Sequence, residues 1–189
     1  MKRRLAACEQ AVIGFGTIKL GQVKEQLVLQ KFNPTRELQK EVVKKMIKSM
    51  EVGDCQNSSN PLFAAVDPNL INQGALVESY DPGQPIIEPP RAEFLNPKAK
   101  IYILAGYHRV TASLQTAALL ANSLNKIKEQ LDKIQGDDEY DAEEEDGVSK
   151  YSLALTLKGE IKVVNQLIAN VQAWPVCFYD LGKPPFPQQ

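Results

Sequence analysis

The sequence predicts an α+β domain, in which a small sheet with flanking helices carries a helical hairpin. Short apolar runs with β-branched or aromatic members predict strands. These runs span residues 27–29, 61–66, 101–104 and 174–180. Longer segments carry apolar residues at helical spacing, which predicts helices. These segments span about 36–51, 108–135 and 149–171.

The size and composition of the chain fit one domain over residues 1–189. The hydrophobic content of 43% is sufficient for a core, and no apolar run approaches the roughly 18–20 residues of a membrane span. A net charge of −1 gives no global signature of nucleic-acid binding. We therefore expect no membrane partner, whereas local basic patches such as Lys2-Arg3-Arg4 remain open as contacts for nucleic acid.

The cysteines and the histidine argue against a metal site. Cys8, Cys55 and Cys177 are far apart and lack metal-ligand spacing, and the chain has one histidine. Three scattered cysteines fit a reducing compartment, so we expect an intracellular protein with no zinc site and no metal-ligand residues.

The N-terminal third is expected to contain two helices and one strand. Residues 3–13 are predicted to form a short helix that ends in a turn at Gly14-Phe15-Gly16. The strand at 27–29 would come next, and Asn33-Pro34 would end it. Thr35 is the predicted N-cap of the 36–51 helix, which Gly53 would terminate.

Residues 72–98 contain five prolines and two glycines, which forbid a continuous helix or central strand. We predict a long loop, a type of segment that often forms a lid or a binding surface. Its apolar anchors would be Leu76, Val77, Ile86 and Ile87.

Two long helices are expected to form the hairpin, with an acidic segment at its tip. The pattern over 108–135 leaves open whether that helix breaks near Asn122-Ser123, and 149–171 reads as one helix or two. Residues 136–148 are mostly acidic, so we expect a flexible linker. They lack the spacing and the central glycine of a calcium-binding loop. The Pro-rich segment 182–189 is expected to be a linker-like tail.

The transition from the 101–104 strand to the next helix carries the clearest chemical signal. Ala105 and Gly106 allow a sharp turn, and His108 and Arg109 fall in the first helical turn. Unpaired N–H groups and the positive end of the helix dipole favour an anion there, and Arg109 could add a bidentate contact. A phosphate is the natural ligand; the alternative is local capping or pairing with carboxylates.

The run from Leu104 to Ala112 resembles the Gly-x-His-Arg box of the ParB/sulfiredoxin-like superfamily. That superfamily includes chromosome-partitioning proteins, sulfiredoxins and free-serine kinases, and its box closes over nucleotide phosphates. The resemblance implies that Gly106, Tyr107, His108 and Arg109 bind a nucleotide. It also implies a mixed sheet into which the 72–98 loop and the hairpin are inserted.

The region from Asn33-Pro34 to Gly53 resembles the first half of the same superfamily. In sulfiredoxins, two hydroxyl residues on this helix face the nucleotide. Their positions correspond to Lys45 and Ser49 here, which adds these two residues to the candidate site. The alternative for both is a solvated helix face.

Three departures from the superfamily restrict the expected activity. Tyr107 occupies the position of the sulfiredoxin cysteine, so sulfinic-acid reduction is not expected. No basic helix-turn-helix region follows the core, as one does in ParB proteins, so sequence-specific nucleic-acid binding is not expected. Glu37 and Glu41 are candidates for the catalytic base of a kinase, but neither aligns with it.

The expected ligand is a nucleotide (ATP, ADP or CTP) with Mg²⁺, and three function classes stay open. The first is a phosphotransferase or NTPase, and the second is a nucleotide-binding switch. The third is a non-catalytic protein-interaction module on a degenerate ParB-like core, with the helical hairpin as its binding face.

Overall fold

A computed structural model describes residues 11–29, 37–54, 60–81, 89–136 and 150–183. Its five strands form one mixed sheet in the order β1-β5-β3-β4-β2. The strands are β1 (Val12–Lys19), β2 (Leu27–Val28), β3 (Leu62–Val66), β4 (Ile101–Ala105) and β5 (Ala173–Asp180). The pairs β3/β5 and β2/β4 are parallel, whereas β1/β5 and β3/β4 are antiparallel. The predicted α+β class is confirmed.

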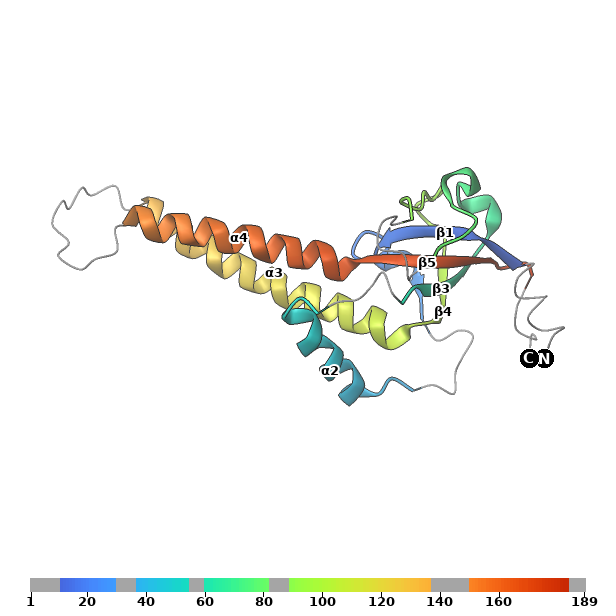
Figure 1. The fold of residues 1–189 in the computed structure, drawn as a ribbon, viewed down its shortest axis with the longest axis horizontal. Helices are drawn as coiled ribbons and strands as arrows, with labels where there is room; N and C mark the ends of the chain where they lie inside the picture. The colour runs from blue at the N-terminus through green and yellow to red at the C-terminus, as the bar shows by residue number, and fades with distance from the viewer. Residues whose placement is uncertain (1–10, 30–36, 55–59, 82–88, 137–149, 184–189) are drawn as a thin grey trace.

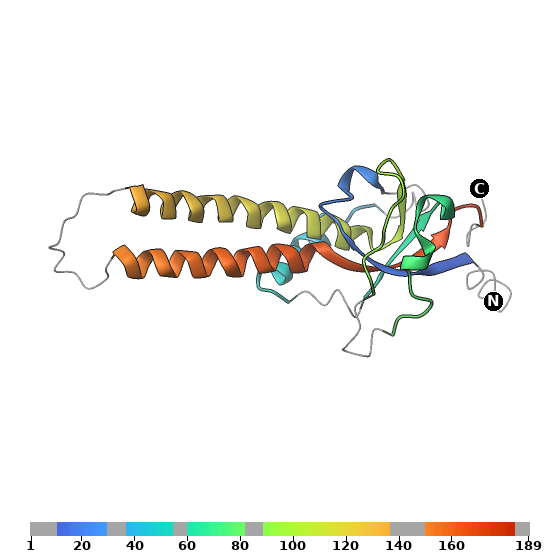
Figure 2. The ribbon, with the colours of Figure 1, turned by 90° about the horizontal axis from the view of Figure 1, so that it is seen from above.

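Three long helices in the described residues accompany the sheet: α2 (Lys40–Glu51), α3 (Tyr107–Gly136) and α4 (Lys150–Gln172). Helices α3 and α4 lie side by side and project from the sheet as a long arm (Figure 1; Figure 2). Helix α2 packs against the part of α3 nearest the sheet. None of the helices in the described part of the chain combines the length and apolar character that a bilayer crossing requires.

The arm is the predicted helical hairpin, and its two helices are each unbroken. Helix α3 runs through Asn122-Ser123 without interruption, because Leu124 and Leu131 continue its apolar face toward α4. From α4, Leu157 and Val171 are buried. Helix α4 passes directly into β5, so the arm is rigidly continuous with the sheet. Most of the predicted linker, 136–148, lies outside the described residues, as does the tail from 184 onward.

The predicted turn at Gly14-Phe15-Gly16 is wrong. Residues 14–16 lie within β1, which pairs with β5 at one edge of the sheet, and residues 3–10 of the predicted helix lie outside the described residues. The glycines are needed because a side chain of the 72–98 segment packs over them. A Cβ at Gly14 would lie 2.9 Å from the Cβ of Leu76, and a Cβ at Gly16 would lie 2.8 Å from its Cδ2.

Helix α2 begins four residues later than predicted, at Lys40. Its N-cap is Gln39, whose side chain makes no capping hydrogen bond, and the predicted cap Thr35 lies outside the described residues. The N–H of Gln39 instead donates to the side chain of His108. A tertiary contact has therefore replaced the local cap that the sequence favours.

The described parts of the 72–98 segment, 72–81 and 89–98, contain no long helix or strand, but both are paired with β1. Phe15 and Val77 exchange two backbone hydrogen bonds, of 2.8 and 3.0 Å. Thr17 is bonded in the same way to Pro90 and Ala92. Further along, the Phe94 ring packs edge-on against Phe178 of β5, with 6.1 Å between ring centroids. The anchors Leu76 and Val77 are confirmed, whereas Ile86 and Ile87 lie outside the described residues.

Gly14→Ala tests the placement of β1. Gly14 has a φ of +152°, and an added Cβ would also approach the carbonyl oxygen of Val77 to 3.0 Å. We expect the free energy of unfolding to fall by about 1–3 kcal/mol in urea denaturation, because the Leu76 contact and the pairing with Val77 must shift.

Gly74→Ala is the matched control for this substitution. The nearest atom to a Cβ at Gly74 is Asn72 Oδ1 at 3.5 Å, an ordinary contact. This variant should unfold within about 0.5 kcal/mol of the parent. Equal stability of the two variants would contradict the close packing of Leu76 on β1.

Candidate functional site

The turn between β4 and α3 depends on the glycine of the predicted box. Gly106 has a φ of +98°, in the region that only glycine adopts at low cost. A Cβ at this position would overlap the side chain of Leu62. The carbonyl oxygen of Gly106 accepts the first helical hydrogen bond, from the N–H of Val110 at 2.9 Å. The chain therefore leaves the sheet and begins a 30-residue helix within one residue.

His108 joins the beginnings of two helices. Its Nε2 accepts the backbone N–H of Gln39 at 3.0 Å, so the imidazole caps α2 from its place in the first turn of α3. The Tyr107 ring lies edge-on to the imidazole at 6.0 Å between centroids. The N-terminal ends of α2 and α3 are thus held together by one side chain.

Arg109 contacts neutral groups of the protein. Its guanidinium donates to the carbonyl oxygens of Asn60 and Pro61, the latter at 3.3 Å, just before β3. It also lies 5.5 Å from the ring centroid of Trp174 at the start of β5. Burial lowers the pKa of Arg109 from its ordinary value. Within the described ranges no carboxylate forms an ion pair with Arg109, so its charge is not neutralised there.

The electrostatics of the two helix ends are consequently positive. The first turn of α3 has no acidic residue and carries the cation Arg109. The first turn of α2 has Glu41, but that carboxylate forms a 3.0 Å ion pair with Lys44. Each helix N-terminus carries roughly half a positive charge, and both are brought to the same place.

The two α2 residues of the candidate site, Lys45 and Ser49, differ in their contacts and in their distance from the start of the helix. Lys45 is exposed, and it forms no ion pair with a described residue. Ser49 is near the other end of α2, where its hydroxyl contacts the carbonyl oxygen and the carboxylate of Asp54 at 3.0 and 3.2 Å. Ser49 is about 15 Å along the helix from Gln39, at 1.5 Å per residue. The structure thus brings the box to the start of α2 but leaves Ser49 at its end.

Several residues around the turn were not predicted as part of the site. Gln39, Asn60 and Trp174 supply the partners of His108 and Arg109. Of these three residues, only Trp174 could have been singled out from the sequence, because it is the single tryptophan of the chain and lies between the last predicted helix and the last predicted strand. Contacts between residues so distant in sequence leave no spacing pattern.

The candidate bases occupy the same end of α2. Glu37 is exposed and lies two residues before Gln39, whereas Glu41 is paired with Lys44. Cys177 is no alternative nucleophile, because burial raises the pKa of its thiol, although a hydrogen bond with Tyr179 lowers it in part. Across the described segments, no cluster of three histidine, cysteine or acidic residues could hold a metal ion.

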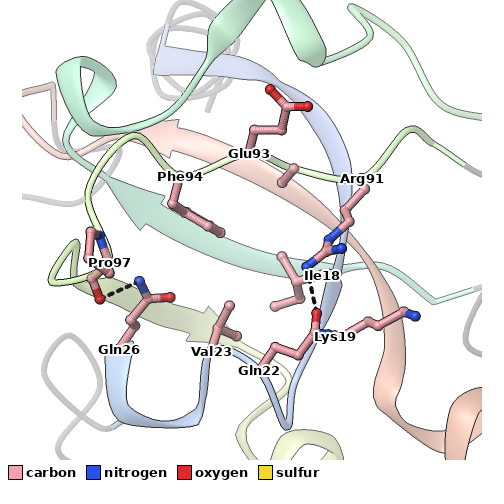
Figure 3. Close-up of a pocket in the computed structure, with 10 residues that line it drawn as sticks. Ile18, Lys19, Gln22, Val23, Gln26, Arg91, Glu93, Phe94 and Pro97 are labelled. Carbon is pink, nitrogen blue, oxygen red and sulfur yellow. Dashed lines mark hydrogen bonds between the residues drawn. The ribbon is translucent and has the colours of Figure 1, made fainter.

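A separate cavity of about 400 Å³ lies at the opposite end of β4 (Figure 3). Its floor includes Ile18 and Phe94. Its polar side chains bind protein groups: Arg91 donates to Gln22 at 2.7 Å, and Gln26 donates to the carbonyl oxygen of Pro97 at 2.8 Å. Pro97 precedes β4 and Gly106 follows it, so this cavity is not part of the candidate site.

Substitution of His108 tests its role as the cap of α2. His108→Ala removes the acceptor of the Gln39 N–H, and we expect a loss of about 1 kcal/mol in the free energy of unfolding, as for other lost N-caps. His108→Gln places an amide oxygen near the position of Nε2 and should recover part of that loss. Urea denaturation compares the three proteins, and equal stability of His108→Ala and the parent would refute the capping role.

Comparisons with protein-family models, with curated proteins and with solved structures find no match to this chain. The residues around Gly106 form a glycine turn at which two helix N-termini and an arginine without a described counter-ion come together.

Proposed function

We propose that the turn at Gly106 binds a phosphate group of a nucleotide (ATP, ADP or CTP) together with Mg²⁺. One observation carries the proposal: the hydrogen bond from the Gln39 N–H to His108 Nε2 holds the positive ends of α2 and α3 together. The resemblance of residues 104–112 to the Gly-x-His-Arg box of the ParB/sulfiredoxin-like superfamily supports the same ligand.

The physical argument is one of uncompensated charge. Two converging helix dipoles repel each other, and the first turn of α3 has no acidic residue to offset them. Arg109 adds a full charge beside them that no described carboxylate neutralises. An anion is the group that relieves this arrangement, and a glycine turn allows it close to the backbone. Lys45, exposed on α2, would be a further cation for the phosphates.

Binding without fast chemistry is the form of this function that the residues support best. Phosphoryl transfer requires a positioned nucleophile or base besides positive charge. Glu37 is near the start of α2 but exposed, and Tyr107 cannot supply the thiolate of a sulfiredoxin. The Mg²⁺ ion would be held mainly by the phosphates, as is usual for nucleotide sites.

A second function, a non-catalytic protein-interaction module, is favoured by a specific observation. The side chains expected on the nucleotide already have protein partners: His108 caps α2, Arg109 holds two carbonyl groups, and Ser49 contacts Asp54. In this function the turn is purely structural, and the arm formed by α3 and α4 binds the partner.

Thermal unfolding with ATP, ADP, CTP or GTP and Mg²⁺ distinguishes the two functions. A ligand that binds only the folded protein stabilises it by about 2.7 kcal/mol at a hundredfold excess over its Kd. For a chain of this size that corresponds to a rise in Tm of roughly 5–10 °C. We expect this rise with at least one nucleotide, and we expect Lys45→Ala to reduce it, because an exposed lysine can be removed without loss of packing.

The control for this experiment is Lys133→Ala, which removes a cation from the last turn of α3, far from Gly106. It should leave the nucleotide effect unchanged, whereas His108→Ala combined with Arg109→Ala should abolish it. Absence of any rise with all four nucleotides would exclude phosphate binding and favour the interaction module. A rise without nucleotide hydrolysis would identify a switch.

A further inference from the structure

The outward face of α4 carries an apolar stripe between Tyr151 and Val163. Tyr151, Leu155 and Val163 are spaced by multiples of four residues and are 77%, 61% and 60% exposed. Beside the outer half of α4, the outward face of α3 is polar by contrast, with exposed residues such as Asn125, Lys126 and Glu129. Among the described elements, only α3 lies beside the outer half of α4 (Figure 1; Figure 2). Apolar side chains aligned in this way are a common mark of an interaction surface.

Gly159 lies at the centre of this apolar stripe. It is about 160° around the helix from the buried Leu157, at 100° per residue, and no atom would come within 4 Å of its Cβ. A glycine inside a helix costs about 0.5–1 kcal/mol relative to alanine, and nothing in the described chain requires one here. A glycine on an exposed apolar face permits a second helix to approach closely.

We propose that two copies of this chain associate through α4, with the two α4 helices parallel and crossing at Gly159. Leu155 and Val163 of each copy then pack on either side of the crossing, against the same stripe of the other copy. The four-residue spacing corresponds to the ridges that cross at about −50°. The two arms therefore diverge on both sides of Gly159.

The charged residues beside the stripe favour a parallel over an antiparallel arrangement of the two α4 helices. Lys158 and Lys162 lie on one flank of the stripe and Glu160 lies on the other. In a parallel pair, opposite flanks meet, so that Glu160 faces Lys158 and Lys162 of the second copy. In an antiparallel pair, like flanks meet, and lysines would face lysines. None of these three residues forms an ion pair with a described residue, so all are available.

This inference rests on the second function above, because it names the partner of the arm as another copy of the chain. It does not depend on phosphate binding. The nucleotide experiment measures the change in Tm of the protein when a nucleotide is added. Association through α4 is measured as the molecular mass in solution. Either experiment can therefore fail without affecting the result of the other.

Sedimentation equilibrium of the full chain tests the proposal. We expect a reversible monomer–dimer equilibrium. Glu160→Lys should raise the dimer Kd at least about tenfold, because each flank then meets like charge. Exchange of all three charges in one chain (Lys158→Glu, Glu160→Lys and Lys162→Glu) should restore the parent Kd. In an antiparallel dimer, Glu160→Lys would have little effect, and that result would overturn the proposed orientation.

Gly159→Leu tests the close crossing separately from folding. The substitution improves helix propensity, so the monomer should unfold at the same or a higher urea concentration, whereas the dimer Kd should again rise at least about tenfold. Asn125→Leu adds the same side chain to the outward face of α3 and should leave the dimer Kd unchanged. A chain that remains monomeric at roughly 1 mM, or a dimer indifferent to Gly159→Leu, would overturn the proposal.

Discussion

The buried indole of Trp174 is the contact on which the arrangement of the arm and the sheet depends. Its Nε1 donates to Ser113 of α3 at 2.9 Å and to the carbonyl oxygen of Val171 at 3.0 Å. Ser113 and Thr116 in turn contact the sulfur of Met50, the last buried residue of α2. One side chain at the junction of α4 and β5 therefore fixes α3, and through α3 it fixes α2. A buried N–H without a partner would cost about 1–3 kcal/mol, so these partners determine where the helices can lie.

The same indole lies beside the guanidinium of Arg109, which connects the arm to the turn at Gly106. Arg109 also donates hydrogen bonds to the backbone that leads into β3. The guanidinium of Arg109 therefore links the beginnings of α3, β3 and β5. Trp174 and Arg109 together give the candidate site a rigid wall. These contacts fix the start of α3, and the His108 hydrogen bond ties the start of α2 to it, so that two helix ends of like charge are kept together.

Much of the fold could be predicted because its main elements have strong local patterns. The strands β3, β4 and β5 and both helices of the arm carry continuous apolar or helical periodicity. The errors occur where a distant residue decides the structure. The sequence around Gly14 and Gly16 predicts a turn, but both glycines lie in a strand because Leu76 packs over them. The start of α2 is determined by His108, which is 69 positions from Gln39 in the sequence. The glycine turn with His108 and Arg109 at a helix start could be placed from sequence, but the partners of both side chains could not.

The contacts of Arg109 define what phosphate binding would require of this chain. Its two acceptors are neutral carbonyl groups, whereas a phosphate would bring an opposite charge to the guanidinium and could accept two parallel hydrogen bonds. A phosphate could therefore compete for the guanidinium, but the carbonyls of Asn60 and Pro61 would lose their donor. The net gain would come mainly from the two helix ends, whose mutual repulsion the anion would relieve. Because His108 holds those ends together through a single hydrogen bond, the strength of any anion site here depends on the cap of α2 as much as on Arg109.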